Sequence, residues 1–175
     1  PSRRDLLTAG GTALVAGALA PQAPGLGFHA HGRDSLRVGL IGCGGRGRGA
    51  AENALRADPN VELVALGDTF PDMVAEALQT LQALPEVGAR VKVDREHCFT
   101  GFDSYQGVIA SSDVVLLATP PHFRPLHVSA AVDAGKHLFV EKPVAVDGPG
   151  LRQVWAASQI AKEKGLALVS GQVAR

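Results

Sequence analysis

The stretch VGLIGCGGRGRG, residues 38–49, places six glycines and two arginines directly behind an apolar run. Within it the pattern G-x-G-x-x-G is satisfied by Gly42, Cys43, Gly44, Gly45, Arg46 and Gly47. The first glycine lets the chain turn tightly, the second lets a pyrophosphate approach the backbone, and the third lets a helix lie close to a strand. A lone match also fits a glycine-rich surface turn, so its weight depends on what flanks it.

The flanks alternate between apolar runs and stretches of helical composition. Runs typical of buried strands occupy residues 36–42, 61–68, 113–120, 137–143 and 166–172. Helices are predicted over residues 48–58, 71–84, 124–135 and 151–165, and a short one over 102–113 capped by Asp103. Residues 85–112 are otherwise hard to place. This alternation predicts an α/β fold, a Rossmann-type doubly wound parallel sheet over residues 36–175.

Asp68 ends the second apolar run, 21 residues after Gly47. A carboxylate there can accept hydrogen bonds from the adenosine ribose hydroxyls of NAD. The ribose phosphate of NADP would place about two negative charges beside it, so NADP should bind less tightly unless Arg46 or Arg48 swings across. Asp68 can also cap the turn into the next helix, and the two roles are compatible. The expected cofactor is therefore NAD rather than NADP.

Composition limits the class of protein. The chain has 175 residues, 46% of them hydrophobic, which suits one domain. Lysine plus arginine and aspartate plus glutamate each total 17, so no net charge attracts nucleic acid. Cys43 and Cys98 form neither a disulfide framework nor a zinc spacing, and no base partner indicates a reactive thiol. We expect no nucleic-acid partner and no metal.

Residues 1–20 have the order of an export signal, with paired arginines, a weakly apolar run and small residues at the end. The sequence SRRDLL resembles the twin-arginine signal, which implies export, to the periplasm in the usual case. The run is shorter than the roughly 20 apolar residues that cross a bilayer, so a permanent anchor is less favoured. An amphipathic helix is the other alternative. Cleavage after Ala18 or after Ala20 stays open, and residues 21–35 have the composition of a linker rich in proline and glycine.

The stretch ATPPHFRPLHVSAAVDAGKHLFVEKPVAVD, residues 118–147, resembles the signature of the glucose-fructose oxidoreductase, inositol dehydrogenase and MocA family. Together with RVGLIGCGGRG and VELVALGD, the resemblance runs from Leu36 to about Gly171. In that family the Rossmann domain precedes an α/β domain that shapes the substrate site and builds the oligomer. That domain is absent after SGQVAR, so we expect an N-terminal fragment of a homo-oligomer.

The resemblance also implies site residues. Lys142 would lie beside the nicotinamide ribose and the substrate hydroxyl as the catalytic residue, where an ammonium stabilises a developing alkoxide. Glu141 would position it or contact the cofactor. A solvated Glu-Lys pair is the alternative. Thr119, Pro120 and His122 would line the cofactor.

One position departs from the family pattern. The family often has a histidine where this chain has Arg124. His127 is nearby, but its spacing from His122 is not that of helical metal ligands, and we expect it to be packed or solvated. Trp155 is predicted to belong to the core stripe of the last helix.

The leading functional hypothesis is an NAD-dependent oxidoreductase that moves hydride between nicotinamide and a sugar, a cyclitol or a related hydroxyl compound. A glycoside hydrolase that uses tightly held NAD shares the domain, but such enzymes usually depart from Glu141-Lys142-Pro143. A nucleotide-binding module without turnover is the third alternative. The substrate and the reaction direction stay open.

Overall fold

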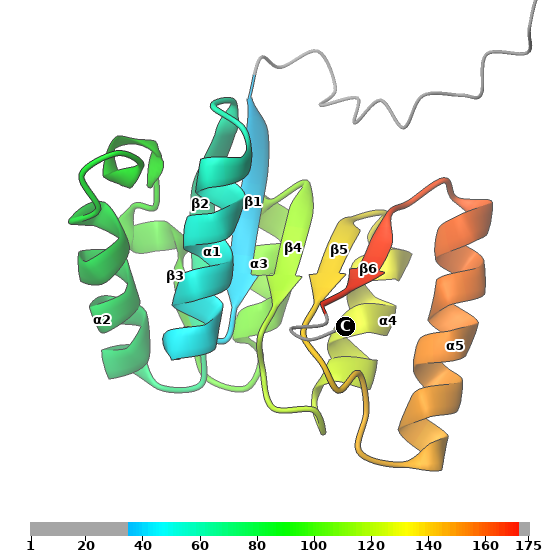
Figure 1. The fold of residues 1–175 in the computed structure, drawn as a ribbon. Coiled ribbons are helices and arrows are strands. Elements are labelled where there is room, and N and C mark those ends of the chain that lie inside the picture. The colour runs from blue at the N-terminus through cyan, green and yellow to red at the C-terminus, as the bar shows by residue number, and fades with distance from the viewer. Residues whose placement is uncertain (1–34, 172–175) are drawn as a thin grey trace, which may run out of the picture.

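A computed structural model describes residues 35–171, which form one six-stranded sheet with helices on both faces (Figure 1). The strands are β1 (Leu36–Ile41), β2 (Val61–Asp68), β3 (Cys98–Thr100), β4 (Val114–Leu117), β5 (His137–Val140) and β6 (Leu168–Ser170). The helices are α1 (Gly45–Ala57), α2 (Pro71–Gln82), α3 (Ser104–Ser111), α4 (Arg124–Asp133) and α5 (Gly148–Glu163). Two single 3-10 turns, Gly88–Arg90 and Arg95–His97, lie between α2 and β3.

The sheet has the order β3-β2-β1-β4-β5-β6, and all neighbouring strands are parallel. The chain builds β1 to β3 toward one edge and then returns to place β4 on the other side of β1. The order of a doubly wound sheet therefore reverses between β1 and β4, where such sheets bind ligands outside the carboxyl ends of the strands. The predicted fold class is confirmed.

The predicted element boundaries are close to those observed. β2 has the bounds expected from its sequence, and α4 and α5 end before Gly135 and Gly165, whose φ values of 71° and 68° suit glycine. The apolar runs 113–120 and 137–143 extend beyond the carboxyl ends of β4 and β5, and residues 118–120 and 141–143 form loops at the carboxyl edge of the sheet.

Three details of the prediction need correction. The sequence pattern does not reveal β3, because three residues are too few for a periodic pattern. Asp103 does precede α3, but its side chain accepts no capping hydrogen bond. Trp155 is not a core residue, because its side chain is 69% exposed. The buried side of α5 consists of the smaller residues Val154, Ala157 and Ala161.

Two hydrophobic cores lie on opposite faces of the sheet. On one face, α1 and α2 pack on β1 and β2 through residues that include Leu40, Leu55 and Leu63. On the other face, α3, α4 and α5 pack on the sheet through residues that include Ile41 and Leu117. Figure 1 shows α1 and α2 in front of the sheet and α3 and α4 behind it. The alternating faces of the strands thus place apolar side chains in both layers.

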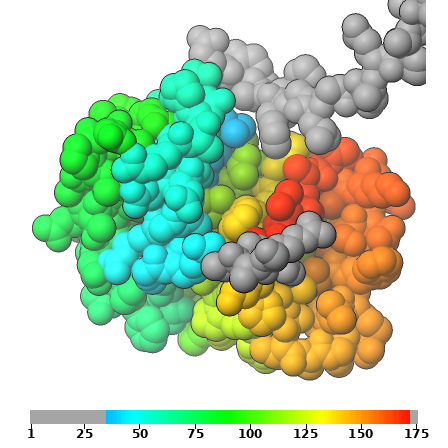
Figure 2. Space-filling view, in the orientation of Figure 1, coloured from blue at the N-terminus to red at the C-terminus, as the bar shows by residue number. Residues whose placement is uncertain are grey.

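The front helices cover only part of the sheet. In Figure 2, atoms of the β5 region (yellow) and β6 (red) reach the surface between α1 (cyan) and α5 (orange). Val169 of β6 is accordingly exposed, and Phe139 of β5 is half-buried. The proposed export signal and linker fall almost wholly outside the described residues.

Candidate functional site

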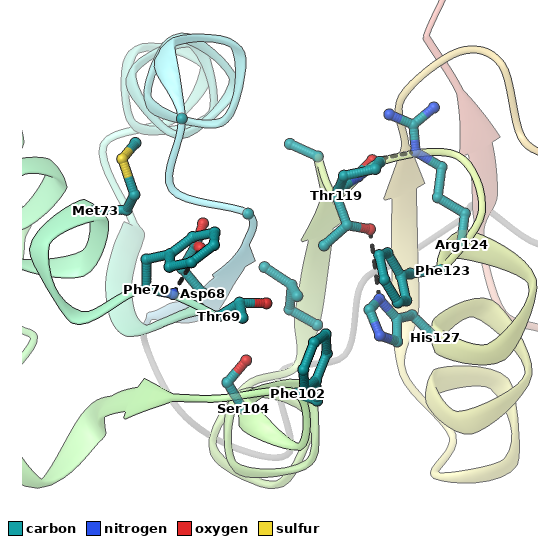
Figure 3. A pocket seen from close by; sticks show the side chains of 15 residues that line it. Asp68, Thr69, Phe70, Met73, Phe102, Ser104, Thr119, Phe123, Arg124 and His127 are labelled. Carbon is teal, nitrogen blue, oxygen red and sulfur yellow. Dashed lines mark hydrogen bonds between the residues drawn. The ribbon is translucent and has the colours of Figure 1, made fainter.

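The candidate site is a pocket of about 610 Å³ at the carboxyl edge of the sheet, beside the ends of β1, β2 and β4. In Figure 3, Asp68, Thr69 and Phe70 lie on one side of the pocket and Thr119, Phe123 and His127 on the other. The full lining is Ile41, Gly42, Gly44, Asp68, Thr69, Phe70, Met73, Phe102, Ser104, Ala118, Thr119, Pro120, Phe123, Arg124 and His127. The pocket therefore lies at the reversal of strand order, with apolar walls and few polar groups.

The glycine loop joins β1 to α1 at one wall. Gly42 has a φ of 95°, and its N–H donates to the carbonyl oxygen of Gly67 at 2.8 Å. Gly47 is buried, and a Cβ atom there would lie 1.8 Å from the carbonyl oxygen of Gly42. These two glycines are thus required by the fold itself, the first for its backbone conformation and the other for the close approach of α1.

Gly44 differs from both. Its φ of −65° and ψ of 178° suit any residue, and a Cβ atom there would meet nothing within 4 Å. Gly44 is the N-cap of α1 and supplies no capping side chain, and the first turn of α1 holds no acidic residue. No side chain therefore caps the backbone N–H groups at this end of α1, and the space beside Gly44 is open, which suits an anion.

Asp68 fastens the glycine loop to the end of β2. Its Oδ2 accepts a hydrogen bond from the backbone N–H of Cys43 at 2.7 Å, and its Oδ1 accepts one from the N–H of Phe70 at 3.1 Å. The turn-capping role that the sequence left open is therefore present. Because Asp68 also lines the pocket and is half-buried, its carboxylate remains next to any ligand there.

Cys43 lies beneath the loop and is fully buried. Burial raises the pKa of its thiol to about 12, so the thiol is neutral at ordinary pH. Gly45 and Arg46 are exposed next to it. Cys43 therefore contributes its backbone N–H and its packing.

The loop after β4 forms the opposite wall. Thr119 is buried, and its Oγ1 lies 3.4 Å from Nδ1 of His127. His127 stacks on Tyr105 with ring centroids 4.5 Å apart, and burial lowers its pKa to about 4. His127 is therefore a neutral, packed residue, one of the two outcomes expected from sequence. Pro120 lines the pocket, whereas His122 is exposed, outside the lining, against the edge of Phe123.

Arg124 is the residue whose importance the sequence did not reveal. It is buried at the start of α4, and its Nε donates to the carbonyl oxygen of Thr119 at 2.7 Å. Its Nη1 donates to the carbonyl oxygen of Glu141 at 2.6 Å and to that of Pro143. One guanidinium thus joins the loop after β4 to the turn after β5. The only available signal was its position where the resembled family often has histidine.

Glu141 and Arg46 meet at the edge of the site. Arg46 donates to Oε1 of Glu141 from Nε at 2.8 Å and also from Nη2. This pairing lowers the pKa of the Glu141 carboxyl, which is only 3% exposed. Lys142 follows in an exposed turn and does not line the pocket. The structure thus brings Gly42, Gly44, Asp68, Thr119 and Pro120 together in the pocket, with Arg46 and Glu141 paired beside it.

Neither a metal site nor a membrane span is found in the described part of the chain. No group of three or more His, Cys, Asp or Glu residues among residues 35–171 could hold a metal ion. No helix within that same range is long and apolar enough to cross a bilayer.

A glycine loop at an uncapped helix start, an acid at the end of β2 and a pocket at the reversal of strand order define a dinucleotide-binding Rossmann domain. Residues 36–172 match the family described as "Oxidoreductase family, NAD-binding Rossmann fold", and the chain belongs to this family. The residues at the site fit that cofactor, because Gly44 leaves space that a Cβ atom would fill.

Three relatives illustrate the family. A glycosyl hydrolase family 109 protein of Shewanella pealeana is 32% identical over 118 residues, covering 65% of this chain and 24% of that protein. An inositol 2-dehydrogenase of Cereibacter sphaeroides is 30% identical over 125 residues, which cover 71% of this chain and 33% of that protein. A structure of scyllo-inositol dehydrogenase from Lactobacillus casei, solved with NAD(H) and scyllo-inositol, has a TM-score of 0.59 at 25% identity. The match covers 78% of this chain and 36% of that chain. The chain therefore spans between 24% and 36% of their lengths.

Proposed function

We propose that this chain is the cofactor-binding part of an NAD-dependent oxidoreductase that transfers hydride between nicotinamide and a hydroxyl carbon of a sugar or cyclitol. The family match and the pocket at the end of β1 support NAD binding. The inositol dehydrogenases among the relatives support a polyhydroxylated substrate. Residues outside this chain would shape the substrate pocket, and the whole protein would be a homo-oligomer.

The observation that carries the proposal is the empty space around Gly44. The fold does not need glycine there, because the backbone conformation is ordinary and an added Cβ atom would meet nothing within 4 Å. Gly42 and Gly47 do have structural reasons. Gly45 and Gly49 also have nothing within 4 Å of an added Cβ atom, so open space alone does not identify a ligand site. Gly44 differs from them because it is the N-cap of α1 and lines the pocket, where a pyrophosphate can approach the backbone.

The test compares Gly44→Val with Gly49→Val. Gly49 lies five residues further along the chain, within α1, and also has nothing within 4 Å of an added Cβ, so both variants should fold. We expect Gly44→Val to abolish NAD binding in calorimetry and Gly49→Val to retain it. Equal NAD affinity of Gly44→Val and the unmodified chain would refute the proposal.

The other site residues have separate roles in this proposal. NAD supplies the hydride acceptor. Asp68 accepts hydrogen bonds from the adenosine ribose, and the exposed rings of Phe70 and Phe102 supply apolar walls for a base at the pocket rim. Lys142 holds a proton at Nζ and stabilises the developing alkoxide of the substrate.

A second candidate is an NAD-dependent glycoside hydrolase, which several relatives in glycosyl hydrolase family 109 favour. The Glu141-Lys142-Pro143 sequence favours the dehydrogenase. Assays of this chain joined to a substrate-binding domain would distinguish the two activities. A dehydrogenase produces NADH in proportion to the oxidised polyol, whereas a hydrolase releases the aglycone of a nitrophenyl glycoside without net NADH.

We further propose that the protein is exported by the twin-arginine route. The support is the order of arginines, apolar run and small residues in residues 1–20. Replacing Arg3 and Arg4 by lysine should retain a fused reporter in the cytoplasm. Unchanged export of that variant would contradict the proposal.

A further inference from the structure

The ion pair between Arg46 and Glu141 links two distant parts of the site. Arg46 is the second residue of α1 and follows the glycine loop, whereas Glu141 comes directly after β5. In the sheet, β4 lies between β1 and β5. The ion pair therefore spans the end of β4, next to the loop that carries Thr119.

The two partners depend on each other unequally. The Arg46 side chain is 51% exposed and water can solvate it, whereas the Glu141 side chain is 3% exposed. Arg124 holds the backbone carbonyl of Glu141 at 2.6 Å, so Glu141 is fixed at that point of the turn. A buried carboxylate without a partner is costly. The backbone N–H of Lys142 also donates to this carboxylate, and Arg46 is its side-chain donor. Glu141 is therefore less stable without Arg46 unless another donor takes that place.

Arg46 also suits a second partner. It stands at the start of α1 beside the open space at Gly44, where the proposed function places a diphosphate. A guanidinium forms strong paired hydrogen bonds with phosphate oxygens. If Arg46 moves to a diphosphate, Glu141 loses its ion-pair partner and keeps only the backbone N–H of Lys142 as a donor and the nearby charge of Arg124. NAD carries a second ribose whose hydroxyls can donate to Glu141, and ADP has no such group.

We propose that the Arg46–Glu141 pair is a specificity device that favours a dinucleotide over ADP. This inference rests on the proposed NAD binding. Glu141 holds Arg46 away from the diphosphate until a ligand also brings donors for Glu141. ADP then binds without the help of Arg46, whereas NAD can recruit it.

The experiment measures the affinities of the whole chain for ADP and for NAD by calorimetry. Glu141→Gln keeps the shape of the side chain and removes its charge, so the ion pair becomes a weaker neutral hydrogen bond and Arg46 can leave it more easily. We expect ADP to bind about tenfold more tightly to Glu141→Gln, the size of one charged hydrogen bond, and the preference for NAD over ADP to shrink. The gain for ADP should disappear in the double variant Arg46→Gln/Glu141→Gln, because the released guanidinium is its source.

Glu76→Gln is the matched control, because Glu76 pairs with Arg48, which lies on the same helix as Arg46. It frees an arginine away from Glu141 and should leave both affinities unchanged. An ADP affinity that does not rise in Glu141→Gln, or a rise that persists in the double variant, would overturn the inference while the NAD-binding proposal stands. A chain that binds neither nucleotide would overturn both.

Discussion

Replacing Gly47 by alanine tests how closely α1 must approach β1. The added Cβ would lie 1.8 Å from the carbonyl oxygen of Gly42 and 3.0 Å from its carbonyl carbon. Both are backbone atoms, so no rotamer change can relieve the contact. Gly42 is itself restrained by its φ of 95° and by its hydrogen bond to Gly67. The start of α1 must therefore move outward.

Two opposing effects determine how much Gly47→Ala changes the free energy of unfolding. Overpacking costs about 1 to 3 kcal/mol, and a backbone contact this short belongs at the upper end. Alanine in place of glycine inside a helix gains about 1 kcal/mol. The cost of the clash is larger than the gain in helix propensity, so we expect the free energy of unfolding to fall by about 2 kcal/mol. At about 3 °C per kcal/mol for a domain of this size, Tm should fall by about 6 °C.

Gly49→Ala provides the comparison, since nothing lies within 4 Å of its added Cβ and only the helix-forming gain remains. Thermal and urea unfolding of both variants and the unmodified chain would measure the difference. If Gly47→Ala were as stable as Gly49→Ala, the close approach of α1 to β1 would not be the reason for glycine at this position.

Three further predictions address the pocket. Asp68→Ala should reduce the preference for NAD over NADP, because the carboxylate repels the ribose phosphate of NADP. The preference is measured as the ratio of the Kd for NADP to the Kd for NAD. A larger ratio in the variant would contradict the role given to Asp68. Burial lowers the pKa of His127 from 6.5 in the unfolded chain to about 4 in the folded one, so the unfolded state binds more protons between these pH values. The free energy of unfolding should therefore fall by an amount on the order of 2 to 3 kcal/mol from pH 7 to pH 4. In urea melts, His127→Gln should lose this part of the pH dependence, and an unchanged dependence of stability on pH would contradict the prediction. Arg124→Met should destabilise the fold by roughly 2 to 4 kcal/mol, because three backbone carbonyls lose a charged donor. Arg124→Lys should recover part of that loss. If Arg124→Met were as stable as the unmodified chain in the same melts, these contacts would contribute little to stability.

The part of the fold that sequence predicted is the part that depends on local pattern. Apolar runs of four to eight residues identified the buried strands, and Gly135 and Gly165 marked helix ends because the observed positive φ favours glycine there. The glycine loop was recognisable because its spacing meets the geometry of a strand-to-helix turn. Each of these signals acts within a few neighbouring residues.

The features that sequence missed depend on contacts between distant residues. Arg124 contacts carbonyls 5, 17 and 19 residues away, and no periodic pattern encodes such contacts. The pairing of Arg46 with Glu141 spans 95 residues. Trp155 was misplaced because an aromatic residue in an amphipathic helix usually faces the core, whereas the narrow contact of α5 accommodates smaller side chains.

The position of Lys142 leads to a last prediction, that this chain binds NAD but has no appreciable sugar or cyclitol dehydrogenase activity. Within residues 35–171, no hydrogen bond or ion pair joins its exposed ammonium to another side chain, and it lies outside the pocket lining. Oriented groups can account for about 7 to 11 kcal/mol of a barrier, and this part of the site contains no partner that orients the lysine. Calorimetry for NAD and NADH formation with a panel of polyols would test both halves of the prediction. Robust turnover by this chain alone would show that the described residues already hold a complete catalytic site and that a different residue orients the substrate.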